Sequence, residues 1–102
     1  MYPGKDFREK SDDTWEYADG YYLGGQIPNK NFGKNPLDPL NNFPTSKYRS
    51  LTEAQVACLG EHAKVCSGIT RLGKGVKNTF FELRMGKTLL PAVQVRSWKK
   101  KV

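Results

Sequence analysis

The clearest hydrophobic pattern in the chain is a run with helical spacing over residues 50–66. Ser50 precedes this run as a helix N-cap, and Glu53 three residues later completes a capping box. Gly68 follows at the position where a glycine commonly ends a helix. We therefore predict one amphipathic helix from Ser50 to Cys66. Its buried stripe is formed by Leu51, Ala54, Cys58, His62 and Val65.

A second pattern, the alternation of apolar and polar residues, predicts two β-strands near the C-terminal end, over residues 79–85 and 88–98. A Gly-Lys dipeptide between them predicts a tight turn. We therefore expect the two strands to pair as a hairpin, in a register that places Val93 opposite Phe81. Residues 69–78, which are basic and rich in glycine, are predicted to connect the helix to this hairpin.

Residues 1–49 show neither period and predict an extended arm. They contain five of the six prolines and few aliphatic residues, yet nine of the twelve aromatic residues. A flexible linker lacks such aromatic residues, so we expect the arm to dock on a larger surface through separate anchors. The predicted anchors are Trp15, Tyr17, Tyr21, Tyr22, Phe32, Phe43 and Tyr48.

Together these patterns predict a small α+β fold, with a long extended N-terminal arm followed by one helix and a β-hairpin. The chain divides into an aromatic, proline- and glycine-rich arm over residues 1–49 and a basic helix–hairpin module over residues 50–102. A chain of 102 residues has room for one small domain at most.

Charge changes this picture, because the whole net charge of +7 comes from the second half. Residues 51–102 hold ten basic and three acidic side chains, whereas residues 1–50 hold seven of each. A basic surface favours an acidic partner. Lys64 and Lys87 belong to this basic half. The predicted residues for binding an acidic partner are Arg71, Lys74, Lys77, Arg84, Arg96, Lys99, Lys100 and Lys101.

The two cysteines predict a reducing compartment. On the predicted helix, Cys58 and Cys66 lie about 12 Å apart along the axis, which is beyond the reach of a disulfide. We interpret them as buried thiols of a protein in the cytoplasm, the cytoskeleton or the mitochondrial matrix. The N-terminal residues resemble neither a signal nor a transit peptide, and no run reaches the roughly 20 apolar residues of a membrane span.

Three motifs suggest chemistry, and each lacks a part. Residues 68–74 match the spacing GxxxxGK, but a glycine follows where a P-loop needs serine or threonine for magnesium. Cys58, His62 and Cys66 share one predicted helix face, but a structural zinc site needs four ligands. His62 is the only histidine and has no assignable catalytic partner. We therefore predict no enzyme activity, no cofactor, no metal site and no small-molecule substrate.

The leading functional hypothesis is a structural or accessory subunit of a large intracellular assembly, bound to other protein subunits through its arm. Microtubules, ribosomes and mitochondrial respiratory complexes all fit, and the sequence does not distinguish them. The alternative is a small basic nucleic-acid-binding protein, because lysine and arginine surround Phe80, Phe81 and Trp98 in the sequence.

Overall fold

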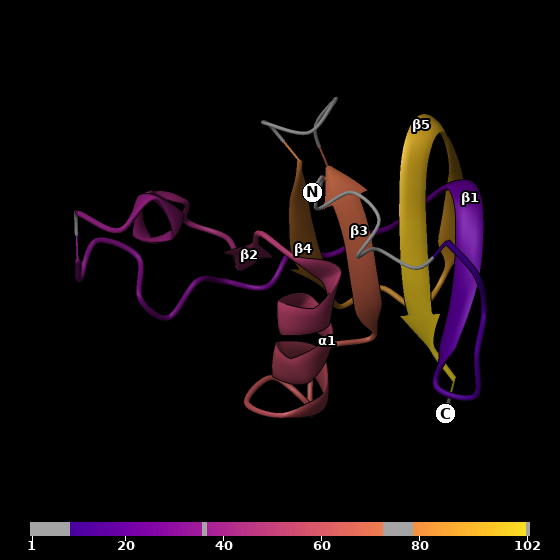
Figure 1. The fold of residues 1–102 in the computed structure, drawn as a ribbon, viewed down its shortest axis with the longest axis horizontal. Helices are drawn as coiled ribbons and strands as arrows, with labels where there is room; N and C mark the ends of the chain where they lie inside the picture. The colour runs from indigo at the N-terminus through magenta and orange to yellow at the C-terminus, as the bar shows by residue number, and fades with distance from the viewer. Residues whose placement is uncertain (1–8, 36, 73–78, 102) are drawn as a thin grey trace, which may run out of the picture.

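The computed structural model describes residues 9–35, 37–72 and 79–101, which form a five-stranded antiparallel sheet with one α-helix beside it (Figure 1). The spatial order of the strands is β1-β5-β3-β4-β2. The elements in chain order are β1 (Trp15–Leu23), the 3₁₀ helix η2 (Pro39–Asn42), β2 (Lys47–Tyr48), α1 (Leu51–Leu59), β3 (Gly68–Leu72), β4 (Phe80–Arg84) and β5 (Leu89–Lys100).

Two strands of this sheet, β1 and β2, come from the N-terminal half, so the predicted fold class, with its extended arm, is wrong. β1 forms one edge and pairs with β5, whereas β2 forms the opposite edge on β4. Trp15 and Leu23, at the two ends of β1, are buried. Large apolar side chains gain several kcal/mol from burial, roughly 1.5–3 each. Burial of Trp15 and Leu23 therefore helps to hold β1 in the fold.

α1 begins where the sequence predicts but ends earlier. Ser50 is the N-cap, and its hydroxyl accepts a hydrogen bond from the Glu53 amide at 3.1 Å. The predicted end at Cys66 is wrong, because Gly60 leaves the helical conformation (φ −106°, ψ −101°) and the helix ends at Leu59. The helix side chains that are buried are Leu51, Ala54, Gln55 and Cys58.

β4 and β5 are both strands, but the predicted hairpin between them is wrong. β3 lies between the two and pairs with each, so the predicted connector supplies the central strand. Gly68 at the start of β3 has no room for a side chain, because a Cβ would lie 2.6 Å from the Trp98 carbonyl oxygen. Because β3 separates β4 from β5, the chain after the Gly-Lys turn crosses to the other side of β3 and does not return along β4.

A bulge in β5 also changes the predicted register. Between the Asp19–Arg96 and Tyr21–Pro91 pairs, Gly20 alone faces residues 92–95 of β5. Gly20 has φ of 83° there. The prediction that Val93 lies opposite Phe81 is wrong, because Val93 lies in this bulge with 88% of its surface exposed.

The core lies between α1 and the sheet, and Trp98 of β5 is central to it. The Trp98 ring is 1% exposed, and its centroid lies 5.9 Å from Phe81 and 5.4 Å from Tyr17. The buried core residues are Trp15, Ile27, Leu51, Ala54, Cys58, Cys66, Ile69, Phe81, Leu83 and Trp98.

A buried carboxylate ties the segment between β1 and β2 to the sheet. Glu82 of β4 points to the face opposite Phe81 and has no exposed surface. Its carboxylate accepts a hydrogen bond from the Thr45 hydroxyl at 2.5 Å. The same carboxylate lies 2.6 Å from Arg84 Nη2 and 3.5 Å from Lys47 Nζ.

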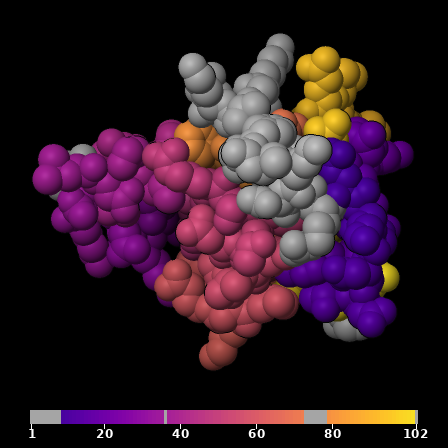
Figure 2. Space-filling model, in the orientation of Figure 1, coloured from indigo at the N-terminus to yellow at the C-terminus, as the bar shows by residue number. Residues whose placement is uncertain are grey.

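Within this segment, residues 29–35 and 37–43 extend away from the sheet as a protrusion (Figures 1 and 2). Internal hydrogen bonds close the protrusion at its base, where the Asn29 side-chain amide donates to the Leu40 and Phe43 carbonyls at 3.1 and 2.9 Å. Phe32 and Leu37 are exposed on it, at 53% and 92%.

Candidate functional site

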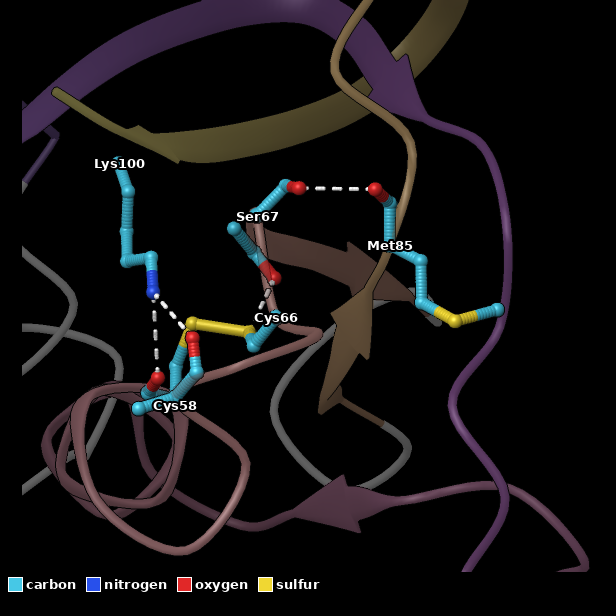
Figure 3. The surroundings of a disulfide bond; sticks show 7 residues. Cys58, Cys66, Ser67, Met85 and Lys100 are labelled. Atoms are coloured by element: carbon cyan, nitrogen blue, oxygen red, sulfur yellow. Dashed lines mark hydrogen bonds between the residues drawn. A yellow bond between two sulfur atoms is a disulfide. The ribbon is translucent and has the colours of Figure 1, made fainter. Parts of the chain in front are cut away.

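A disulfide bond between Cys58 and Cys66 organises the candidate site (Figure 3). The two Cα atoms are only 5.3 Å apart, because α1 ends one residue after Cys58 and the chain turns back toward β3. The predicted pair of separate thiols is therefore wrong, and the predicted reducing compartment loses its basis. Both cysteines are buried, at 0% and 3% exposure.

Lys100 of β5 reaches over the loop that the disulfide closes (Figure 3). Its Nζ donates hydrogen bonds to the Cys58 and Ala63 carbonyls at 3.5 and 3.3 Å. The Cys58 carbonyl lies in the last turn of α1, where the helix dipole places partial negative charge. The charge of Lys100 therefore has partners inside the fold.

A concave surface with a volume of about 330 Å³ opens beside the disulfide, and we call it the lysine pocket. β5 contributes Lys99, the loop before β3 contributes Lys64, and the turn after β4 contributes Lys87. The complete lining is Ala63, Lys64, Val65, Cys66, Ser67, Met85, Lys87, Lys99 and Lys100.

Three of the four pocket lysines carry charge that the described part of the chain does not neutralise. Within residues 9–35, 37–72 and 79–101, no carboxylate lies within 4.0 Å of Lys64, Lys87 or Lys99. Glu16 is paired with Lys99 in the β1–β5 ladder, yet the two side chains form no ion pair. The pocket can therefore attract an anion from outside.

The other predicted basic residues lie elsewhere. Arg84 is buried against Glu82, and Arg71 is buried with Nη2 3.4 Å from the Thr79 hydroxyl. Arg96 Nε lies 2.8 Å from a Glu9 carboxylate oxygen, and Lys101 Nζ donates to the Asp12 carbonyl. Lys74 and Lys77 lie outside the described residues. Of the predicted set, the pocket thus brings together Lys99 and Lys100, and it adds Lys64 and Lys87.

The predicted aromatic anchors are distributed over the fold. Trp15 is buried, Tyr17 packs on Trp98, and Tyr48 lies in β2. Tyr21 and Tyr22 belong to β1, where Tyr21 is 40% exposed. Phe43 packs edge-on against Phe80, with centroids 5.1 Å apart, and Phe32 is exposed on the protrusion.

A second concave surface, which the sequence did not reveal, lies along the outer side of α1. We call it the acidic groove, and its volume is about 400 Å³. Val56 is 67% exposed on this side, and the carboxylates of Glu53 and Glu61 stand beside it. The groove is lined by Tyr48, Thr52, Glu53, Val56, Ala57 and Glu61.

The surroundings of Tyr48 in this groove change the pKa of its phenol. Partial burial, and then the negative charges of Glu61 and Glu53, raise the pKa of the Tyr48 phenol above its ordinary value of 10.0. The raised pKa favours the neutral phenol in the folded state. Its contribution to stability is therefore complete below pH 10.0 and is lost as the pH rises through the folded-state pKa.

We expect an ultraviolet titration of phenolate absorbance to detect this shift. The difference between the wild type and Tyr48→Phe isolates the Tyr48 transition, which should lie above pH 10.0. Glu61→Gln should move the transition to lower pH, because it removes the larger of the two carboxylate contributions that raise the pKa of the phenol. A Tyr48 transition at or below the ordinary value would contradict the assignment.

The residues of the three motifs that suggested chemistry have structural positions in the fold. Cys58 and Cys66 are bonded to each other, and His62 is buried with Nε2 3.4 Å from a Glu61 carboxylate oxygen. The described residues contain no group of three His, Cys, Asp or Glu side chains arranged to hold a metal. Gly68, the first glycine of the GxxxxGK match, begins a β-strand. In the same described ranges, no helix has the length and apolar character needed to cross a membrane.

Comparison of the chain with protein-family models, curated proteins and solved structures gives no match. The functional proposal therefore rests on the chain's own residues.

Proposed function

We propose that the protein is a non-enzymatic binding module, an accessory component of a larger assembly, that holds an acidic group of a partner protein in the lysine pocket. The observation that carries this proposal is the set of three lysines without an internal carboxylate around one concave surface. Like charges held together repel each other, so an external anion stabilises such a cluster.

The pocket offers more than charge. Met85 is 41% exposed and Val65 is 49% exposed at its wall, so an apolar side chain next to the anionic group gains contact there. The Ser67 hydroxyl donates to the Met85 carbonyl at 2.8 Å, which fixes the loop against the turn after β4. A prearranged surface loses less entropy on binding.

Aromatic residues favour a protein over a nucleic acid as the partner. Binding of single-stranded nucleic acid uses exposed rings on which bases stack. Phe81 and Trp98 are buried, at 2% and 1% exposure, and Phe80 packs against Phe43. Of the three rings that suggested nucleic acid, Phe81 and Trp98 therefore belong to the interior, and Phe80 is partly covered by Phe43.

The disulfide supports an oxidising compartment as the place of action. Disulfide bonds persist in secreted proteins and in oxidising organelles, and the cytosol keeps thiols reduced. Cys58 and Cys66 are both buried, so small reductants have poor access to the bond.

We expect a fluorescein-labelled hexaglutamate peptide to bind the wild-type protein in an anisotropy titration. Lys64→Ala combined with Lys99→Ala should weaken binding by about 2- to 5-fold per lysine, because an exposed charge pair contributes roughly 0.4–1 kcal/mol. Glu16→Gln should strengthen binding, because it removes a negative charge paired with Lys99 across the ladder.

Lys10→Ala combined with Lys34→Ala is the matched control, because both lysines are exposed and lie outside the pocket lining. An equal loss of affinity in this control would contradict the proposal, since it would mean that only net charge matters. Displacement of the peptide by an oligothymidylate of equal charge, with a similar affinity, would establish nucleic acid as the partner instead.

A further inference from the structure

The acidic groove differs in polarity from the rest of the molecule. The chain carries a net charge of +7, yet two carboxylates flank this groove. Glu53 accepts a hydrogen bond from the Ser50 hydroxyl at 3.1 Å, and Glu61 lies 3.4 Å from His62. Neither carboxylate has a lysine or arginine within 4.0 Å among the described residues. The negative potential at the groove therefore remains available to an outside cation.

The floor of the groove is apolar. Val56 is 67% exposed, and Ala57, the next residue of α1, also lines the groove. The hydroxyphenyl ring of Tyr48 closes one side from β2. An apolar side chain placed here would remove both partners' apolar surface from water. The volume of about 400 Å³ suits one or two side chains of a peptide segment.

We propose that the acidic groove is a binding site for a segment of a partner protein that carries a lysine or arginine next to an apolar side chain. The apolar side chain lies on Val56, and the cation lies between Glu53 and Glu61. Charge complementarity selects this partner over an acidic protein or a nucleic acid, both of which the two carboxylates repel. A second copy of the chain is disfavoured, because two molecules of charge +7 repel each other.

This site is separate from the lysine pocket, because the two surfaces share no lining residue. A basic segment on the groove and an acidic group in the pocket can therefore be held at the same time. The proposal for the groove stands whether or not the lysine pocket binds an acidic partner.

The test is a nuclear magnetic resonance titration of the full chain, with its disulfide intact and uniformly labelled with ¹⁵N. The probe is the peptide Lys-Leu-Lys-Leu-Lys, and Lys-Gly-Lys-Gly-Lys is its charge-matched control. We expect the leucine peptide to shift the amide signals of the groove lining and to bind at least about 3-fold more tightly than the glycine peptide, from the burial of apolar surface.

Glu53→Gln combined with Glu61→Gln should weaken binding of the leucine peptide by up to about 5-fold per carboxylate. Glutamine preserves the capping box at the start of α1, so this variant keeps its helix. Val56→Ser should remove the difference between the two peptides. The control is Asp13→Asn combined with Asp19→Asn. Both positions lie outside the groove, so this variant should leave the affinity for the leucine peptide unchanged.

Four results would each overturn the proposal. The first is failure of the leucine peptide to shift the groove signals, and the second is equal affinity for both peptides. The third is unchanged affinity in the double glutamine variant. The fourth is a shift of the groove signals with protein concentration in the absence of peptide. That result would show that a second copy of the chain, and not a partner segment, occupies the groove.

Discussion

Replacing Glu82 with alanine should lower the free energy of unfolding by about 3–5 kcal/mol, because removing one partner of a buried ion pair leaves the other charge unpaired. Arg84 is 8% exposed and would keep its charge beside an empty space. The Thr45 hydroxyl and Lys47 would also lose their acceptor. Urea unfolding followed by circular dichroism measures the difference.

Two further variants separate the charge of Glu82 from its volume. Glu82→Gln keeps the volume and an acceptor oxygen, so it should cost less than Glu82→Ala. Glu16→Ala, in an exposed position of β1, should change stability by less than about 0.5 kcal/mol. A loss below about 1 kcal/mol in Glu82→Ala would show that the network does not hold the segment before β2.

Replacing both Cys58 and Cys66 with serine should lower the free energy of unfolding by about 2–4 kcal/mol, because the bond restricts the unfolded chain. The serine hydroxyls would also be buried where sulfur now lies in the core. Guanidinium unfolding of the oxidised wild type and of the double variant provides the comparison.

The reduced wild type is the control for the serine side chains. It lacks the bond but keeps the sulfur atoms, so its stability should lie between those of the oxidised protein and the double variant. Identical unfolding midpoints for the oxidised and reduced wild type would show that the bond does not stabilise the fold.

Local features of the fold could be predicted from the sequence. The start of α1 follows from the Ser50–Glu53 cap, and β4 and β5 follow from alternation. Both signals arise from neighbours along the chain, which a sequence displays directly. The end of α1 was missed because the apolar spacing continues through Val65, although a glycine at position 60 weakens the helix.

Strand pairing could not be predicted, because it depends on residues far apart. The turn at Gly86 reads as a hairpin whether β4 and β5 pair with each other or both pair with β3. β1 was missed because Gly20 and scarce aliphatic residues obscure its period. Its pairing with β5 becomes visible only in three dimensions.

The side-chain clusters and the candidate sites could be predicted only in part, because they also join residues that are far apart in the sequence. Period 2 places Glu82 and Arg84 on one face of β4, but only the fold shows that the segment before β2 covers that face. Lys99 and Lys64 meet because β5 lies beside the disulfide loop. The acidic groove needs Tyr48 of β2 next to α1, which no local pattern indicates.

The position of β1 in the sheet orders the steps of folding. Within the described residues β1 has one strand partner, β5, which is also the last strand, so the β1–β5 ladder cannot form until nearly all of the described chain has been synthesised. Closing such a long loop lowers the chain entropy before the β1–β5 contacts can compensate, and this slows folding. The short loop from Cys58 to Cys66 can close much earlier. Trp15, which is 4% exposed in the folded protein, should therefore become buried late, when β1 joins the sheet.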